Sequence, residues 1–212
     1  MRRRGLLIAL EGIDGAGKST LHRGLAAALR AEGLSVRRRR EPTDRKIGAL
    51  AQAASVDDPW TGAVYFTVDR HRARADLERD LGRYDVVLTD RSFYSTLAYQ
   101  GSALSPGDRR RLERLELAAT VRPDRVILLD LPARVAVARL GARTSARGPL
   151  ERQRTLERVA RSYRTLARSG AWVVLDATRP ADELRREALA RLGVPRHTPA
   201  RRSTRARTRA PR

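Results

Sequence analysis

The 212-residue sequence predicts an α/β fold, a three-layer α/β/α sandwich built on a five-stranded parallel sheet. Short apolar runs recur along the chain, and such runs are typical of strands that are buried on both faces of a parallel sheet. Helix-like segments separate these runs, and this alternation predicts helices on both faces of the sheet. An acidic residue lies in or just after each strong run, and open α/β sheets hold their sites at the carboxyl ends of the strands.

The expected strands are the apolar runs themselves. A weaker strand, Ser35–Arg40, has only Val36 as a core residue, and its position between the first helix and Glu41 decides the assignment. The strong runs, each with the acid that marks its end, are Leu6–Leu10 with Glu11, Val86–Leu88 with Asp90, Val126–Leu131 with Asp130, and Trp172–Leu175 with Asp176.

The expected helices have recognisable ends. Gly82 is a candidate C-cap of the second helix, and Asp108 is a candidate N-cap of the third. Pro180 opens the last helix, and Gly193 closes it. In chain order the helices are one that begins near Ser19 and ends at Gly33, then Ala63–Leu81, Asp108–Val121, one that begins at Pro132, one that carries Leu156, Val159, Tyr163 and Leu166 and stops before Gly170, and Ala181–Leu192.

The composition excludes several kinds of site. The chain has no cysteine, so a disulfide, a thiol nucleophile and a cysteine-bound metal are excluded. His22, His71 and His197 are scattered, which argues against a histidine metal cluster. No apolar run approaches the roughly 20 residues that span a membrane, and the basic start runs into Glu11 and not into a signal-peptide cleavage site. We therefore expect a soluble, cytoplasmic protein without a membrane partner.

The net charge is strongly positive, +21 from 45 basic and 24 acidic residues. Arginine is spread through every segment, so the excess is a bias of the whole chain and does not by itself indicate a nucleic-acid surface. The one concentrated basic run, residues 196–212, has no acid and no apolar residue beyond three alanines. We expect one domain over residues 1–195 and a disordered basic tail over 196–212, and nucleic acid is not expected as a substrate.

Residues 12–19 form a complete phosphate-binding loop, G-x-x-x-x-G-K-S, between the first strand and the first helix. Its glycines let backbone N–H groups point at phosphate oxygens, and the helix N-terminus behind them favours an anion. Lys18 has the reach for the β- and γ-phosphates, and the Ser19 hydroxyl is suited to Mg²⁺. Lys18 and Lys46 are the only lysines in this arginine-rich chain, which indicates that the motif position needs a compact ammonium.

Further motifs follow the phosphate loop in order. Glu41-Pro42-Thr43 comes after the second strand, and Phe66 and Arg70 lie one helical turn apart, so they share a face. Asp90-Arg91-Ser92 closes the third strand, and Ser95-Thr96-Leu97-Ala98-Tyr99-Gln100-Gly101 follows it directly. From Leu6 to about Ala188 this set resembles the thymidylate kinase (dTMP kinase) family of P-loop nucleoside monophosphate kinases, which has an E-P segment, an F-x-x-x-R pair and a D-R-x…S-x-A-Y-Q-G segment in the same order.

The resemblance implies an enzyme that transfers the γ-phosphoryl group of MgATP to dTMP and produces dTDP. Positioning and charge neutralisation carry such a transfer, so no general base is expected. Lys18, Asp90 and Arg91 are the candidate catalytic residues of the core, and Ser19 and Asp90 are the candidate metal ligands. The expected ATP-binding residues are Gly12, Ile13, Asp14, Gly15, Ala16, Gly17, Lys18, Ser19, Thr20 and Arg139, the last of which flanks the adenine.

On the acceptor side, each motif has an expected partner on the nucleotide. Phe66 is suited to stack on the base, and Arg70 to donate to a carbonyl oxygen of the pyrimidine. Arg91 is suited to a bidentate grip on the phosphate. Phe66 as a core residue, Arg70 as a solvated charge and Asp90 as a structural ion pair or N-cap stay open as alternatives. The resemblance also implies that Asp14 meets the sugar, Tyr99 crowds its 2′ side, Gln100 lines the pocket and Arg45 is a second phosphate ligand.

A lid is expected over about residues 139–154, which combine five arginines with glycine and proline. Members of the family carry a catalytic arginine either in the phosphate loop or in the lid. Positions 13–16 of this loop hold no arginine, so the lid must supply it. Arg143 and Arg147 are the candidates, and they would neutralise charge on the transferring group after closure excludes water.

Two departures from the family pattern fall on the acceptor side. The family commonly has E-P-G-G-T, whereas Glu41-Pro42-Thr43-Asp44-Arg45 lacks both glycines. The third-strand motif usually ends in Tyr or His, and here it ends in Ser92. Another nucleoside monophosphate or a deoxynucleoside therefore stays open as the acceptor. A nucleotide-binding protein without turnover, which binds nucleic acid through its basic surface and tail, is the alternative of a different class. The resemblance also implies a homodimer.

Overall fold

The computed structural model describes residues 4–141, 153–168 and 170–193, and within them the five expected strands form one sheet. Their order in the sheet is β2-β3-β1-β4-β5, and every adjacent pair is parallel. The predicted fold class is therefore confirmed. The strands are β1 (Leu6–Glu11), β2 (Val36–Arg40), β3 (Val86–Asp90), β4 (Arg125–Asp130) and β5 (Val173–Asp176).

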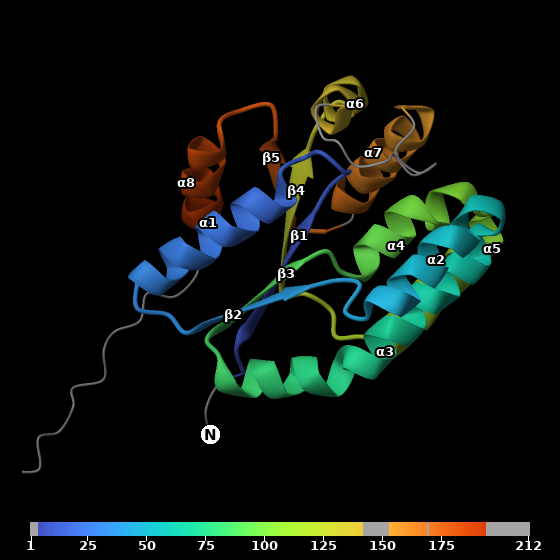
Figure 1. Ribbon diagram of the computed structural model, residues 1–212. Coiled ribbons are helices and arrows are strands. Elements are labelled where there is room, and N and C mark those ends of the chain that lie inside the picture. The colour runs from blue at the N-terminus through green and yellow to red at the C-terminus, as the bar shows by residue number, and fades with distance from the viewer. Residues whose placement is uncertain (1–3, 142–152, 169, 194–212) are drawn as a thin grey trace, which may run out of the picture.

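Helices cover both faces of the sheet and complete the three layers (Figure 1). Their bounds are α1 (Lys18–Ala31), α2 (Arg45–Asp57), α3 (Pro59–Arg83), α4 (Phe93–Tyr99), α5 (Pro106–Ala119), α6 (Ala133–Gly141), α7 (Gln153–Arg168) and α8 (Ala181–Leu192), with a 3₁₀ turn, η1, at Gly101–Ala103. The helices α1 and α8 pack together over one face, and α3, α4, α5 and α7 lie on the other (Figure 1).

Alternate residues of β1 pack on opposite faces of the sheet. Ile8 and Leu10 belong to the core cluster that includes Leu25 of α1, whereas Leu7 packs with Leu81 of α3. Because side chains alternate across a strand, this one central strand anchors both helical layers. Full burial of each such leucine contributes roughly 1.5–3 kcal/mol before other terms are counted.

Two helix ends differ from the prediction. Gly82 was wrong as a C-cap, because it lies inside α3, which continues to Arg83. Gly193 does have the left-handed backbone of a terminal glycine, with φ of 57° after α8. At α5 the N-cap is Ser105, whose hydroxyl accepts from the N–H of Asp108 at 3.2 Å, so Asp108 was wrong as the cap and lies in the first turn.

The helices α2 and α4 were not predicted. The buried residues of α2 are Gly48, Ala51 and Ser55, which are too small or polar to produce an apolar stripe in the sequence. This inner face packs tightly on α3, since a Cβ on Gly62 would lie 1.9 Å from the Ser55 hydroxyl. The helix α4 is short and buried along its whole length, so it has no polar face that would show a helical period.

The strand order places β1 and β3 side by side where the chain changes direction across the sheet. The loop after β1 leads to α1 on one face, and the loop after β3 leads to α4 on the other (Figure 1). Leu10 and Asp90 are paired in the register, so the phosphate loop and the Asp90-Arg91 segment begin next to each other. Open α/β sheets bind their ligands in a crevice at this kind of position.

Some predictions concern segments outside the described residues. They include the tail over 196–212 and the part of the lid that carries Arg143 and Arg147. The boundary at residue 195 and the lid therefore stay predictions. In the part of the chain that is described, no helix has the length and apolar character needed to cross a membrane.

Candidate active site

The phosphate loop joins β1 to α1, and its glycines have backbone angles that other residues avoid. The φ angle is 140° at Gly12, 83° at Gly15 and 93° at Gly17. A Cβ on Gly12 would also lie 2.6 Å from the carbonyl oxygen of Leu129 in β4, so space requires glycine there as well. The loop thus leads the chain into the N-terminus of α1, where free N–H groups favour a phosphate.

Lys18 is buried in the first turn of α1, and its side chain folds back over the loop. Its Nζ donates to the carbonyl oxygens of Gly12 and Ile13, both at 2.9 Å, and lies 3.8 Å from Oδ1 of Asp14. Burial lowers the pKa of the Lys18 ammonium to about 8, and the charge of Arg91 acts in the same direction. A phosphate at this position would raise that pKa again and keep the ammonium charged.

The side chains of Ser19, in the first turn of α1, and Asp90, at the end of β3, are in contact. The Ser19 hydroxyl donates to Oδ2 of Asp90 at 2.8 Å, because β3 lies directly beside β1. Phosphate-loop enzymes hold Mg²⁺ with a hydroxyl of the loop and a carboxylate from a neighbouring strand, and Mg²⁺ prefers oxygen ligands. The structure therefore brings together the two residues that the sequence suggested as metal ligands.

Arg91 lies beside the phosphate loop and is held on several sides. Its φ of 80° is the only positive value at a non-glycine residue in the described part of the chain, a conformation that the surroundings must hold in place. Its Nη1 donates to the Ser95 hydroxyl at 3.1 Å, and its Nη2 forms an ion pair with Asp14. The guanidinium carbon also lies 5.2 Å from the centre of the Tyr99 ring, a distance typical of cation–π contacts.

Asp14 connects the phosphate loop with the acceptor side. Its N–H donates to the Tyr99 hydroxyl at 3.0 Å, and its carboxylate pairs with Arg91. Burial acts to raise the pKa of Asp14, but the charges of Arg91 and Lys18 outweigh it and hold the pKa below its ordinary value. An ionised Asp14 between these two cations keeps their separation fixed before any phosphate binds.

A pocket of about 500 Å³, including the open space at its mouth, adjoins the phosphate loop. Arg45 is exposed in the first turn of α2 and does not line this pocket, so its contact with a phosphate stays a prediction. The pocket is lined by six predicted residues, Asp14, Phe66, Arg70, Arg91, Tyr99 and Gln100. It is also lined by five residues to which the sequence assigned no role, Glu41, Pro42, Gln52, Ser95 and Thr96.

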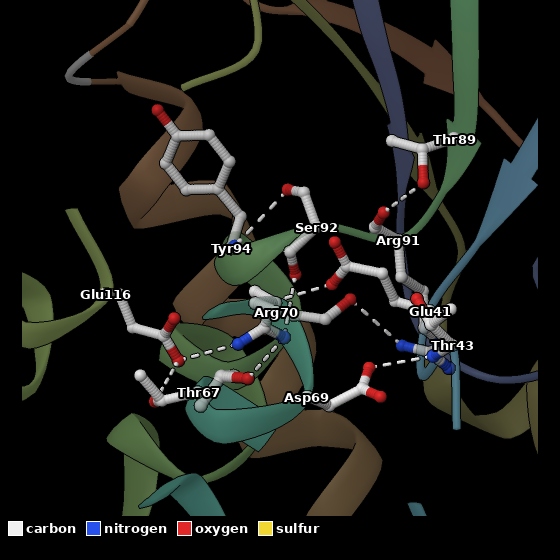
Figure 2. A network of polar contacts seen from close by, with 12 residues as sticks. Glu41, Thr43, Thr67, Asp69, Arg70, Thr89, Arg91, Ser92, Tyr94 and Glu116 are labelled. Carbon is white, nitrogen blue, oxygen red and sulfur yellow. Dashed lines mark hydrogen bonds and ion pairs between the residues drawn. The ribbon is translucent and has the colours of Figure 1, made fainter. Parts of the chain in front are cut away.

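Arg70 is the centre of a buried polar network (Figure 2). Its Nε donates to Glu41 and its Nη1 to Glu116, both at 2.7 Å. Its Nη2 donates to the Thr96 hydroxyl at 2.8 Å and to the Ser92 carbonyl at 3.4 Å. The side chain is 4% exposed, so the alternative of a solvated surface charge is wrong. The contact of Arg70 with a base stays a prediction.

Glu11, at the end of β1, ties the segment after β3 to the sheet. Its fully buried carboxylate accepts from the N–H and the hydroxyl of Ser92 at 2.8 and 2.6 Å. It also accepts from the hydroxyls of Ser95 at 2.6 Å and Tyr163 at 2.9 Å. Burial raises the pKa of Glu11, and these hydrogen bonds oppose the rise. Ser92, where the family usually has Tyr or His, is thus a small hydroxyl that binds Glu11 and also caps α4.

Asp69 accounts for the departure in the segment after β2. Its buried carboxylate accepts from the N–H groups of Thr43 at 2.7 Å and Asp44 at 2.8 Å. Asp44 in turn caps α2 through the N–H of Lys46. Because a side chain satisfies these N–H groups, the segment is ordered without the two glycines of the family pattern. Adjacent residues of α3 therefore hold it at two points, Asp69 at Thr43 and Arg70 at Glu41 (Figure 2).

A second open pocket, about 790 Å³ with its solvent-open space, lies on the other side of the phosphate loop. Arg139 of α6 lines it, and its guanidinium is fixed by bonds to the carbonyl oxygens of Gly15 at 3.3 Å and Ala177 at 3.0 Å. Gly17 and Thr20 line the same pocket, as do residues 177–180 between β5 and α8 and Ala181 at the start of α8. No role was predicted for this loop, although Asp176 marks the strand end that leads into it.

Glu41 is expected to make the stability of the protein depend on pH. Burial raises the pKa of its carboxyl from 4.5 to about 7, and the ion pair with Arg70 opposes the rise. The contribution of Glu41 to the free energy of unfolding is complete below the unfolded pKa and is lost as pH rises through the folded pKa, because the unfolded chain gives up the proton first.

Glu41→Gln removes this titration. Urea unfolding at intervals between about pH 4.5 and 8 should therefore show that the variant gains stability relative to wild type as pH rises to about 7, and that the difference is then constant. Effects of the substitution that are common to both protonation states of Glu41 shift the whole curve and do not change its slope, whereas the ion pair with Arg70 is already included in the folded pKa of Glu41. Parallel curves for the two proteins would contradict the assignment.

A family model described as thymidylate kinase matches residues 10–188, which include the phosphate loop and both pockets. The chain belongs to the thymidylate kinase family. A thymidylate kinase of Xanthomonas euvesicatoria pv. vesicatoria is 43% identical over 188 residues, with 87% of this chain and 81% of the relative covered. One from Xanthomonas campestris pv. campestris is 40% identical over 193 residues with the same coverage. A probable thymidylate kinase of Metallosphaera sedula is 34% identical over 178 residues, covering 84% of this chain and 87% of the relative.

Membership in the thymidylate kinase family confirms the resemblance that the ordered motifs indicated. The match runs through both departures, the segment at Thr43 and Asp44 and the serine at position 92, so neither takes the chain out of the family. Family membership does not assign roles to individual residues, so their contacts with ATP, Mg²⁺ and the acceptor stay predictions.

Proposed function

We propose that this protein transfers the γ-phosphoryl group of ATP to dTMP and releases dTDP and ADP. The observation that carries the proposal is the position of Asp14, which belongs to the phosphate loop and also lines the acceptor pocket. A triphosphate on the loop and a monophosphate in the pocket would therefore have their phosphates in one crevice. Holding both reactants there makes the transfer effectively intramolecular.

In this reaction Lys18 and Arg91 neutralise the reacting phosphates from two sides. Lys18 exchanges its bonds to the carbonyls of Gly12 and Ile13 for oxygens of the β- and γ-phosphates. Arg91, oriented by Asp14 and Ser95, offers two N–H groups to the phosphate of dTMP. Because charge spreads over the phosphoryl oxygens in the transition state, cations fixed beforehand lower the barrier, and no general base is needed.

Ser19 and Asp90 would hold the Mg²⁺ that accompanies ATP, since their oxygens already meet at 2.8 Å. When bound, Mg²⁺ neutralises charge on the β- and γ-phosphates. Arg139 would flank the adenine at the wall of the second pocket, where two carbonyl groups fix its guanidinium. Arg143 and Arg147, outside the described residues, are the arginines proposed for the lid.

The acceptor pocket suits a thymine nucleotide in chemical terms. Arg70 has five N–H groups and makes four hydrogen bonds within the described residues, which leaves one N–H on Nη1 for a base carbonyl. Phe66 offers the flat apolar surface on which a base stacks. Tyr99 is held by the N–H of Asp14 near the phosphate end, where its ring would crowd a 2′-hydroxyl. Gln100 completes this end of the pocket.

The cellular setting follows from the same family. The substrates would be the small molecules ATP and dTMP, and the product dTDP belongs to nucleotide biosynthesis. We propose that the protein is cytoplasmic, as the sequence led us to expect, and that it is a homodimer, as the resemblance implies. The basic tail over 196–212 has no part in the proposed reaction.

ATP that is radiolabelled at the γ-phosphate tests the reaction. With dTMP present, the label should move to dTDP in an amount equal to the ADP formed, because the acceptor phosphate lies where water would otherwise attack. Without dTMP, ADP formation should nearly stop. Label that appears only as inorganic phosphate, or turnover that needs DNA or RNA and ignores dTMP, would contradict the proposal and favour a nucleic-acid-binding protein.

A further inference from the structure

A buried carboxylate, Glu116 of α5, contacts Arg70 but does not line the acceptor pocket. Its side chain is 0% exposed. Its Oε1 accepts from Nη1 of Arg70 at 2.7 Å and from the Thr67 hydroxyl at 3.0 Å (Figure 2). A buried ion pair usually stabilises a protein no more than apolar side chains of the same volume do. Stability alone therefore does not explain a glutamate at this position.

Arg70 connects Glu116 with the pocket, because Arg70 lines the pocket and Glu116 does not. The Thr96 hydroxyl, which also lines the pocket, accepts from Nη2 of Arg70 at 2.8 Å. Different partners therefore hold the two terminal nitrogens of the guanidinium, Glu116 at Nη1 and Thr96 at Nη2. Burial raises the pKa of Glu116, and the charge of Arg70 is the strongest effect that opposes this rise.

We propose that Glu116 is a positioning residue that sets the hydrogen-bonding pattern by which the pocket distinguishes thymine from cytosine. It holds Nη1 of Arg70 so that the remaining N–H of this nitrogen faces the base. Thymine presents the O4 carbonyl as an acceptor, which matches this donor. Cytosine presents an amino donor at the same position, so this contact would be mismatched. The inference rests on the proposed function, because it concerns the base of the acceptor.

Glu116→Gln tests the inference with little change of volume. The glutamine side chain is neutral, so it attracts the Arg70 guanidinium less strongly and holds Nη1 less firmly. We expect the KM for dTMP to rise at least about tenfold and the preference for dTMP over dCMP in kcat/KM to fall by a similar factor. The KM for ATP should stay within about twofold of wild type, since ATP binds elsewhere. Glu113→Gln, the same change at an exposed position of α5, should alter none of these values.

Thr67→Val supplies a second variant that keeps every charge. It removes a hydroxyl whose single proton is shared between Oε1 of Glu116 and the Ala63 carbonyl, so it should weaken the preference for dTMP over dCMP in the same direction by a smaller factor. This variant carries the test if Glu116→Gln does not fold. The inference would be overturned if the folded variants kept the wild-type preference for dTMP over dCMP. It would also be overturned if the KM for ATP rose as much as the KM for dTMP. A wild-type protein that fails to phosphorylate dTMP would instead contradict the proposed function itself.

Discussion

Lys18→Ala is expected to leave a folded protein in which phosphoryl transfer is slower by roughly 10³-fold or more. The Nζ atom lies within the phosphate loop, 2.9 Å from two backbone carbonyls, at the position where the transferring phosphates would bind. No other side chain of the loop can replace this charge, because Lys18 is its single lysine and no arginine lies between residues 12 and 19. Steady-state kinetics with ATP and dTMP measures the effect.

The same substitution should change stability little. Burial already lowers the pKa of Lys18 to about 8, which shows that the folded protein holds this charge at a cost. Thermal unfolding followed by circular dichroism therefore checks that the variant is folded. Lys46→Ala, at the exposed second lysine of the chain, is the matched control and should retain full activity. Near-normal turnover by folded Lys18→Ala would contradict the role of the phosphate loop.

Arg91→Ala is expected to lower kcat/KM for dTMP by about 100-fold or more, because a bidentate, charge-assisted contact with phosphate is lost. The KM for ATP should change much less. The structure has already oriented this arginine, with its backbone in the left-handed region and its guanidinium between Asp14 and Ser95. The side chain therefore loses little conformational freedom when a phosphate binds, which increases its value to the reaction.

Arg91→Lys separates charge from geometry. A lysine keeps the positive charge but cannot form two parallel bonds to one phosphate, so it should recover only part of the lost activity. Unfolding measurements are needed beside the kinetics, because Asp14 loses its main partner in the alanine variant. If Arg91→Ala affects ATP and dTMP equally, Arg91 acts on the phosphate loop as a whole, and its assignment to the acceptor phosphate is wrong.

The phosphate loop, the strands and the crevice between β1 and β3 could be predicted because local rules determine them. A G-x-x-x-x-G-K-S loop has one backbone geometry. The strong apolar runs are typical of strands that are buried on both faces of a parallel sheet. The spacing of Phe66 and Arg70 correctly placed both on one face of α3, and both line the pocket. These features depend on residues that are close in sequence or on a strand order common to the fold class.

The partners of Arg70 could not be predicted, because they come from three separate segments. Glu41 follows β2, Glu116 lies on α5 and Thr96 lies on α4, so only the tertiary fold brings them to one guanidinium. The helix α2 was not predicted for a different reason. Its packing face consists of small residues, which produce no apolar stripe in the sequence. The two departures from the family pattern also needed the structure, which supplies Asp69 and Glu11 as the partners of the altered segments.

A panel of acceptors assayed with MgATP shows which nucleotide this protein phosphorylates. We expect dTMP to be preferred over UMP, dCMP and thymidine. In the proposed site Arg91 would bind the acceptor phosphate, the Tyr99 ring would crowd the 2′-hydroxyl of a ribose, and a cytosine amine facing Arg70 would cost about 1–3 kcal/mol. If dTMP is inactive while another of these acceptors is phosphorylated well, the pocket of this chain has a different specificity, and the account of its acceptor side is wrong.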